Sequence, residues 1–178
     1  MTVTLVHPYD AAWPEWFEVL RARLQAPLAG VANGIEHVGS TAVPAMAAKP
    51  IVDIDIVVER ADFAAVREHL ARLGYVHQGD KGIPDREAFD LADAEAKRSL
   101  PAHHLYVCMA GCAELRKHLD FRDFLRQHPE WVRRLSEHKL DLCERHDNDR
   151  QAYIDGKSEM VQRITELARQ STETVRAH

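Results

Sequence analysis

The sequence has no long apolar segment. No run approaches the roughly 20 consecutive apolar residues that a transmembrane helix needs, and this absence argues against a membrane partner. Cysteine is also scarce, because the 178 residues include three, namely Cys108, Cys112 and Cys143. An odd count without a secretory leader pattern predicts no disulfide framework and a reducing, cytoplasmic location.

An excess of positive charge is missing as well. Lysine and arginine number 23 against 28 aspartate and glutamate residues, which gives a formal net charge of −5. This balance argues against a general nucleic-acid-binding protein, although it is compatible with a local basic groove. The hydrophobic fraction of 46% and the charged fraction of 29% are ordinary for a globular protein with room for a core.

The most informative stretch is an apolar segment interrupted by two acids. Residues 51–58, IVDIDIVV, are few and rich in β-branched side chains, which is typical of a buried β-strand. Successive strand side chains point to opposite faces, so Asp53 and Asp55 share one face. The other face is expected to pack into a core and carries only aliphatic residues: Val52, Ile54, Ile56 and Val58.

Two neighbouring carboxylates in an apolar strand are costly, because burial disfavours charge and each carboxylate disfavours ionisation of the other. A hard divalent cation, Mg²⁺ or Mn²⁺, would offset this cost, since it prefers closely spaced oxygen ligands. Asp53 and Asp55 are therefore the predicted metal ligands. The alternative is that both lie at an exposed strand edge and pair with arginine or lysine.

A glycine–serine turn stands upstream of the acidic strand. Residues 34–38 predict a strand that ends at Gly39-Ser40, and the residues after it have a helix-compatible composition that Pro44 limits. Backbone N–H groups and a hydroxyl at such a turn can bind a phosphate, especially where a helix starts. Gly39, Ser40 and Thr41 are therefore predicted to bind phosphate.

The order Gly-Ser, then Asp-x-Asp resembles the pattern of the nucleotidyltransferase superfamily, which has a polymerase-β-like catalytic core. More closely, residues 35–44 (IEHVGSTAVP) and 48–54 (AKPIVDI) are similar to the signature of the GrpB family, a bacterial group also found fused to dephospho-coenzyme A kinase. With weaker matches elsewhere, the resemblance covers roughly residues 5 to 165. One departure is Ala45, which stands where the family usually has glycine, so a tighter or altered turn is expected there.

The resemblance implies an α+β fold with a small mixed β-sheet of the nucleotidyltransferase type, flanking helices and a helical C-terminal part. We expect one domain over residues 1–178, with an α/β core over about 1–110 and C-terminal helices over about 111–170 packed on it. Apolar periodicity predicts helices over residues 11–24, 63–74, 114–127, 129–145 and 153–170. Asp62 is expected to cap the start of the second helix, and Gly74 is expected to stop it. A short edge strand is expected at 3–6, and a frayed tail at 171–178.

Residues 78–96 are irregular and charged, which predicts either a lid over a substrate or a mobile solvated loop, with a short helix over residues 90–97. The GrpB family carries a basic residue before an aromatic residue in this region, and Arg86 and Phe89 resemble that pair. The resemblance makes Arg86 a candidate phosphate contact, because a guanidinium can bind two phosphate oxygens at once.

Further basic residues are candidate phosphate contacts. Lys49 precedes the acidic strand, where it can neutralise phosphate charge or pair with Glu36, whose orientation the pattern leaves open. The match to the family in the last helix is Tyr153 with Lys157, an i, i+4 pair that faces one side of the helix. This pair can aim a phenol and a cation at a nucleotide, or it can lie solvated on a helix that packs on the core.

Residues 103–108, HHLYVC, predict another strand, and the family has a comparable His-His-Leu-x-Val sequence. A transferase of this superfamily places a third carboxylate on the strand beside the Asp-x-Asp strand, whereas this chain has His104 or His103 there. An imidazole can act as a base or as a metal ligand. His104 therefore joins Asp53 and Asp55 as a predicted catalytic residue.

Two functions follow from these residues. In the first, the chain is an enzyme that binds a nucleoside triphosphate with Mg²⁺ and transfers the nucleotidyl group to an unknown acceptor. In the second, it is a catalytically reduced module that binds a nucleotide or docks on a partner enzyme. The intact Gly-Ser and Asp-x-Asp pair favours the first function, and the missing third carboxylate favours the second.

Overall fold

The computed structural model describes residues 5–176, and residues 1–4 and 177–178 are not described. The chain divides into two compact units. Among the described residues, the sheet unit comprises 12–38 and 51–116, and the helical unit comprises 5–11, 39–50 and 117–176. The predicted single domain, with its core over about 1–110 and helices over about 111–170, stays a prediction.

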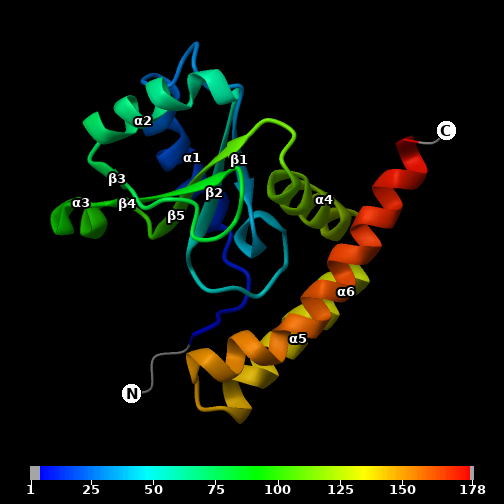
Figure 1. The fold of residues 1–178 in the computed structure, drawn as a ribbon. Coiled ribbons are helices and arrows are strands. Elements are labelled where there is room, and N and C mark those ends of the chain that lie inside the picture. The colour runs from blue at the N-terminus through cyan, green and yellow to red at the C-terminus, as the bar shows by residue number, and fades with distance from the viewer. Residues whose placement is uncertain (1–4, 177–178) are drawn as a thin grey trace. The chain divides into compact units, whose positions relative to one another are not determined.

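The sheet unit is built on a five-stranded mixed sheet in the order β1-β2-β5-β4-β3 (Figure 1). Its strands are β1 Gly34–Val38, β2 Val52–Val58, β3 Tyr75–His77, β4 Arg86–Leu91 and β5 His103–Met109. β2 and β5 run parallel, and the other neighbouring pairs are antiparallel. The predicted α+β class with a small mixed sheet is confirmed.

One face of the sheet is the core of this unit. The aliphatic residues of β2 that alternate with the aspartates are fully buried: Val52, Ile54, Ile56 and Val58. Leu105 and Val107 extend the same apolar face onto β5, because they are the register partners of Ile54 and Ile56. Strand periodicity therefore separates an apolar face from the face that carries the aspartates.

Two helices cover the apolar face, and Figure 1 shows them on the same side of the sheet. α1 (Ala12–Gln25) buries the predicted apolar stripe, and its Phe17 ring stacks on His37 of β1 with centroids 4.7 Å apart. α2 (Phe63–Arg72) places Phe63 edge-on to His77 of β3. His37 thus belongs to the core face and not to the aspartate face.

The ends of α2 were predicted with partial success. Asp62 precedes the helix, but its side chain makes no capping hydrogen bond, so the predicted cap is wrong. Gly74 has a positive φ of 88°, which supports its predicted role as the C-terminal stop because glycine adopts this conformation without a steric penalty.

The predicted loop over residues 78–96 contains a strand and a helix. β4 spans Arg86–Leu91 and pairs with both β3 and β5, and α3 follows at Ala94–Ser99. The sequence of β4, REAFDL, does not alternate between charged and apolar residues, because Ala88 and Phe89 are both buried, so no period of two was visible. The short helix predicted over residues 90–97 begins at Ala94 instead. The chain therefore runs from β2 through α2 to the far edge of the sheet before β4 and β5 fill the gap.

The helical unit consists mainly of α4 (Ala113–Gln127, whose first residues belong to the sheet unit), α5 (Pro129–Arg145) and α6 (Arg150–Arg176). Pro129 opens α5 at a position where its missing N–H costs no helical hydrogen bond. The predicted frayed tail from residue 171 is wrong, because α6 continues to Arg176. Arg169 bonds both Glu166 and Glu173, one turn away on either side, and this supports the extra turns.

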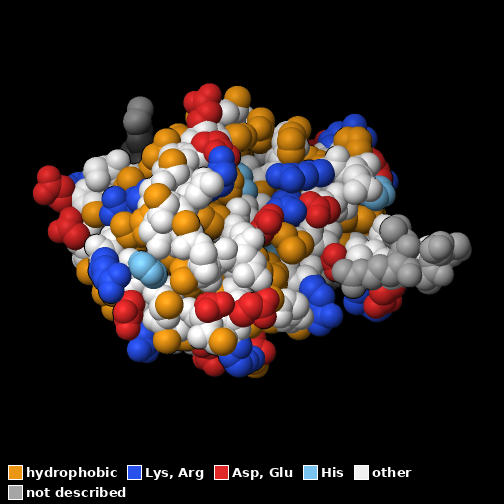
Figure 2. Space-filling model, turned by 90° about the horizontal axis from the view of Figure 1, so that it is seen from above, with side chains coloured by type: hydrophobic (Ala, Val, Ile, Leu, Met, Phe, Trp, Pro, Cys, Tyr) orange, Lys and Arg blue, Asp and Glu red, His pale blue; other side chains and the backbone are white. Residues whose placement is uncertain are grey.

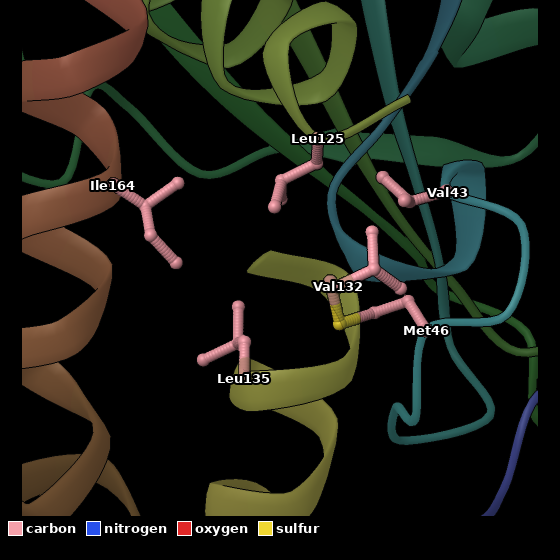
Figure 3. Packing of buried hydrophobic residues seen from close by; sticks show 6 residues of the cluster. All are labelled: Val43, Met46, Leu125, Val132, Leu135 and Ile164. Atoms are coloured by element: carbon pink, nitrogen blue, oxygen red, sulfur yellow. The ribbon is translucent and has the colours of Figure 1, made fainter. Parts of the chain in front are cut away.

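The core of the helical unit joins three helices to residues 39–50. Figure 3 shows six buried residues that point toward one another from these segments: Val43, Met46, Leu125, Val132, Leu135 and Ile164. The composition of residues 41–48 is compatible with a helix, but the structure forms only a short 3₁₀ turn here, η1 at Ser40–Ala42. Val43 and Met46 follow this turn, so packing against α4, α5 and α6 replaces helical hydrogen bonding.

Ala45 occupies the left-handed region with φ of 63°. The chain thus keeps, with alanine, a backbone conformation that glycine adopts more readily. The expected edge strand at residues 3–6 lies partly outside the described residues. In the described part, His7 forms an isolated antiparallel bridge with Ala48.

The surface carries both signs of charge. On the face drawn in Figure 2, acidic and basic side chains are interspersed with apolar ones. This distribution agrees with the modest net charge of −5.

Candidate functional site

The sheet unit places both aspartates on one face of β2. In the register of the sheet, Val38, Asp53 and His104 form one row across β1, β2 and β5. Glu36, Asp55 and Tyr106 form the next row. Residues in the same row project from the same face, so this face collects acidic, imidazole and phenol groups.

Asp53 and His104 are joined by a hydrogen bond of 2.8 Å between Oδ1 and Nδ1. The side chains are 32% and 52% exposed, respectively, so both can reach a ligand. Asp55, by contrast, is fully buried. The alternative in which both aspartates lie at an exposed edge does not describe Asp55, since β2 is an inner strand.

The structure decides between the two histidines at the start of β5. His104 lies on the aspartate face. His103 lies on the opposite face, where its Nε2 is 2.8 Å from the Tyr75 hydroxyl and its Nδ1 is 2.7 Å from the Pro101 carbonyl oxygen. His104 is therefore the imidazole beside the acidic pair.

Glu36 is a third carboxylate on the aspartate face. Its orientation was left open by the sequence, and the antiparallel register with Asp55 settles it. Within residues 5–176, however, no group of three or more histidine, cysteine or acidic side chains gathers closely enough to hold a metal ion.

Arg86 lies on a strand and not in a mobile loop. Its guanidinium carbon is 4.4 Å from the centroid of the Tyr106 ring, on the aspartate face. In the described part of the chain, the buried Nε of Arg86 has no hydrogen-bond partner. Burial and nearby Asp53 raise the pKa of Tyr106, whereas Arg86 lowers it, so this phenol stays neutral at physiological pH.

The helical unit holds the residues of the Gly-Ser turn. Gly39 has φ of 72°, a conformation that favours glycine, and it precedes η1 directly. Thr41 is 2% exposed and belongs to the interior of the unit. Lys139 of α5 donates to Ser40 Oγ at 2.7 Å and to the Ala47 carbonyl oxygen at 3.0 Å.

Lys139 is a functional candidate that sequence reasoning missed. It is 2% exposed, and its ammonium group fixes the serine hydroxyl of the predicted phosphate turn. A signal was present in the sequence, because Lys139 stands four residues after Leu135 and three before Leu142, at an apolar position of the helix stripe. A lysine there must find a polar partner inside the unit.

A second cationic cluster surrounds Tyr153. The ammonium groups of Lys49 and Lys157 lie 4.8 Å and 4.9 Å from the centroid of its ring. Burial lowers the pKa of Lys49, and the nearby charges of Lys157 and Arg150 lower it further. Tyr153 is 2% exposed, and burial raises its pKa, so the phenol is neutral.

The predicted site residues thus fall into two groups. The sheet unit brings together Asp53, Asp55, His104 and Arg86 on one face. The helical unit contains the others: Gly39, Ser40, Thr41, Lys49, Tyr153 and Lys157. Each unit therefore carries one part of the predicted chemistry, carboxylates in the first and most of the cations in the second.

In the described chain, no helix is both long enough and apolar enough to cross a membrane. The cytoplasmic location itself stays a prediction.

Two solved structures resemble this chain, one closely and the other in its fold alone. The crystal structure of conserved protein GrpB from Enterococcus faecalis matches with a TM-score of 0.80 and 28% identity, over 94% of this chain and 98% of that chain. The poly(U) polymerase Cid1, in a complex with MgATP, matches with a TM-score of 0.52 and 10% identity, over 75% of this chain and 42% of that chain. The second likeness shows the nucleotidyltransferase fold alone.

Curated relatives agree with this result. UPF0157 proteins of Bacillus subtilis and Pseudomonas aeruginosa are 33% and 37% identical to the chain over about nine tenths of its length. The chain spans only 46% and 65% of these two proteins. A UPF0157 protein of Halalkalibacterium halodurans is 33% identical over 94% of this chain and 83% of its own length. The model of the GrpB protein family matches residues 3–167, and the chain therefore belongs to the GrpB family.

Proposed function

We propose that the chain binds a nucleoside triphosphate with Mg²⁺ and transfers the nucleotidyl group to an acceptor. The observation that carries this proposal is the pair Asp53 and Asp55 on one face of an inner strand, in a sheet of nucleotidyltransferase fold. Carboxylate pairs of this kind suit phosphoryl chemistry, in which positioning and charge neutralisation supply most of the catalysis.

The donor set fits Mg²⁺ or Mn²⁺. Asp53 and Asp55 provide carboxylate oxygens on one face, and the hydrogen bond to His104 occupies one oxygen of Asp53. Mg²⁺ is commonly bound by one or two carboxylates and completed by water and substrate phosphates, so two protein ligands suffice. When bound, the ion would neutralise phosphate charge and polarise the phosphorus that is attacked.

The candidate lysine and arginine side chains can neutralise the negative charge of a triphosphate. Burial and the nearby charge of Lys157 lower the pKa of Lys49, and a phosphate near the two lysines would offset this repulsion. Ser40, oriented by Lys139, offers a hydroxyl, and Gly39 can bring its backbone close to a phosphate oxygen. Arg86 offers a guanidinium that is held against Tyr106.

His104 supports both functions drawn from the sequence. As an imidazole fixed by Asp53, it can take the proton of an attacking hydroxyl, which is the role of a general base. Its presence beside the acidic pair, where a transferase of this superfamily has a carboxylate, also favours the second candidate, a catalytically reduced module that binds a nucleotide or docks on a partner enzyme. Nucleotide binding is common to the transferase and to the nucleotide-binding form of this module, so it is tested first.

The first test is a thermal-shift panel of ATP, GTP, CTP and UTP, each with and without Mg²⁺ or Mn²⁺. A ligand that binds the folded state raises the midpoint of unfolding, and the gain grows with the logarithm of ligand concentration. We expect a metal-dependent shift with at least one nucleotide. The absence of a shift with every nucleotide and metal contradicts the proposal.

The second test replaces both Asp53 and Asp55 with asparagine. This double variant is expected to lose the metal-dependent part of the shift, because the amides keep the shape of the side chains but lose their charge. The matched control is Asp62→Asn, since the Asp62 side chain precedes α2 without capping it. An unchanged metal response in the double variant removes the metal assignment. Nucleotide binding without pyrophosphate release identifies the binding module.

A further inference from the structure

A cavity of about 290 Å³ opens in the sheet unit where β4 ends and β5 begins. Much of its wall is apolar and firmly packed: Tyr75, Phe89 and Leu91 are each at most 5% exposed. The short segment before β5 adds Pro101 and Ala102. The volume lies near the lower end of the range of about 300–1,000 Å³ that is typical of small-molecule sites.

The one polar pair in the deep wall is neutral and already engaged. The Pro101 carbonyl oxygen can only accept a hydrogen bond, so Nδ1 of His103 carries the proton and Nε2 accepts from the Tyr75 hydroxyl. Burial lowers the pKa of His103 and raises the pKa of Tyr75 to about 12, so neither group is charged near pH 7. The two groups therefore meet a ligand as neutral hydrogen-bonding groups, with the Arg23 guanidinium beside them.

Charge is also balanced at the rim of the cavity. Lys97 of α3 lies against the cavity, and its ammonium group is 2.7 Å from a carboxylate oxygen of Asp90, which lies there too. The two opposite charges are paired with each other, and both side chains stay about half exposed. The apolar wall therefore favours a ligand with an uncharged body.

His104 links the cavity to the aspartate face. It lines the cavity, and its Nδ1 is 2.8 Å from Asp53 Oδ1. A carboxylate can only accept, so Nδ1 donates to Asp53, and in the neutral ring the lone pair lies on Nε2. A carboxylate thus fixes both the orientation and the tautomer of an imidazole that borders the cavity.

We propose that this cavity is the acceptor subsite, and that the acceptor is a small, uncharged alcohol or phenol with a largely apolar body. This inference rests on the proposed function, because it supplies the second substrate of the same reaction. The apolar body would pack against Tyr75, Phe89 and Leu91, and the hydroxyl would point toward His104. The small volume argues for a small molecule and against a nucleic-acid strand in this cavity.

The proposed reaction is a nucleotidyl transfer from the nucleoside triphosphate to the acceptor hydroxyl. The acceptor oxygen attacks the α-phosphorus of the nucleoside triphosphate, and a new oxygen–phosphorus bond forms. The bond between the α-phosphorus and the bridging oxygen of pyrophosphate breaks, and pyrophosphate leaves with that electron pair. The hydroxyl proton passes to Nε2 of His104 and from there to water. The product is a phosphodiester of the acceptor.

The binding claim is tested on the full chain without nucleotide. The probes are benzyl alcohol, phenol and cyclohexanol, and their contact with the protein is measured by ligand-observed saturation-transfer NMR. Benzoate and benzylamine are the charged comparators of the same size. We expect the uncharged hydroxyl compounds to bind more tightly than either charged compound. Preferential binding of a charged comparator, or no binding by any of the three alcohols, overturns the proposed acceptor class.

A cavity-filling variant tests whether the probe binds in this cavity. Ala102 lines the cavity, and its backbone oxygen accepts from Val52 N at 2.9 Å, a bond that a side-chain change leaves in place. Ala102→Trp is expected to weaken probe binding by about tenfold or more, which corresponds to about 1.4 kcal/mol. The matched control is Ala64→Trp on the exposed side of α2, where probe binding is expected to stay unchanged. Equal probe binding in Ala102→Trp and in the wild type overturns the assignment of the cavity.

Nucleotide binding separates failure of this inference from failure of the proposed function. The metal-dependent nucleotide shift is expected to persist in Ala102→Trp, because that change leaves Asp53 and Asp55 in place. Probe binding without any nucleotide shift in the wild type leaves the cavity intact as a site and overturns the nucleotidyl-transfer role. His104→Gln is expected to keep probe binding and to lose the pyrophosphate that the probe releases from the nucleoside triphosphate. Pyrophosphate release that survives in His104→Gln overturns the role of His104.

Discussion

The two units assemble their candidate residues in different ways. In the sheet unit, the aspartates and His104 come from two neighbouring strands whose register sets them side by side. In the helical unit, the partners are distant in the chain: Lys139 donates to Ser40 across 99 positions, and Lys157 of α6 approaches the same Tyr153 ring as Lys49. The first arrangement follows from strand geometry, and the second depends on how three helices pack around residues 39–50.

This difference decides which contacts are robust. A strand side chain is held by its neighbours in the ladder on both sides, so its direction changes little when one contact is lost. A lysine on a helix reaches its partner with four flexible bonds, and it needs that partner because its charge is buried. Substitutions in the sheet unit should therefore lower stability mainly through lost packing. Substitutions in the helical unit should lower it mainly by breaking a polar contact.

The largest expected effect is in the sheet unit. Phe17→Ala removes a ring that is 9% exposed and stacked on His37, and it should lower the free energy of unfolding by about 3–5 kcal/mol. Chemical denaturation measures this loss. Val19→Ala on the same helix is the control, because Val19 is 53% exposed and its loss should cost little. If the two variants are equally stable, the α1 stripe is not part of the core.

The next effect concerns nucleotide affinity. Arg86→Ala should weaken binding of the nucleotide that gives the thermal shift by more than about tenfold, since a hydrogen bond to a charged group contributes about 1.5–3 kcal/mol. Isothermal titration calorimetry measures the affinity. Arg60→Ala is the control, because the Arg60 side chain is 72% exposed and paired with Asp85. Equal affinity in Arg86→Ala and wild type would mean that the guanidinium only packs on Tyr106.

A smaller effect is expected for the polar contact of the helical unit. Lys139→Met keeps the length of the side chain but leaves Ser40 Oγ and the Ala47 carbonyl oxygen without their donor, which should cost about 1–3 kcal/mol of stability. Denaturation with and without nucleotide measures both the stability and the nucleotide-dependent gain. Leu140→Met, at the exposed neighbouring position, is the control. A more stable Lys139→Met variant with a full nucleotide gain would show that the ammonium is dispensable for both properties.

Much of the fold could be predicted because its elements follow simple periods. The strand at 34–38 and the helix at 129–145 match the structure at both ends, and the period of two placed Asp53 and Asp55 together. The strand at 86–91 could not be predicted, because Arg86, Glu87 and Asp90 make the segment look like a solvated loop, whereas pairing on both edges stabilises it. Tertiary context overrides local composition there.

The candidate site was predictable where it depends on strands. His104 was the predicted catalytic histidine, although the sequence also offered its neighbour His103. The two occupy adjacent positions on opposite faces, and the parallel register with Asp53 places His104 on the aspartate face. Lys139 was missed because its partners, Ser40 and Ala47, are brought to it by tertiary packing. Its position in an apolar helix stripe was the one local signal, and the sequence does not say which polar group it serves.

The smallest expected effect tests the backbone of residues 39–50. Ala45 has φ of 63°, a left-handed conformation that costs an alanine about 1–2 kcal/mol. Ala45→Gly removes this cost but adds unfolded-state entropy worth about 0.4–1 kcal/mol, so a net stabilisation of up to about 1 kcal/mol is expected in chemical denaturation. The same substitution at Ala64, inside α2, should instead destabilise by about 1 kcal/mol, because helical glycine is unfavourable. Opposite signs at the two positions would show that the turn after Pro44 is held in a conformation suited to glycine, and a loss of stability in both would mean that the methyl group of Ala45 contributes packing that outweighs its backbone strain.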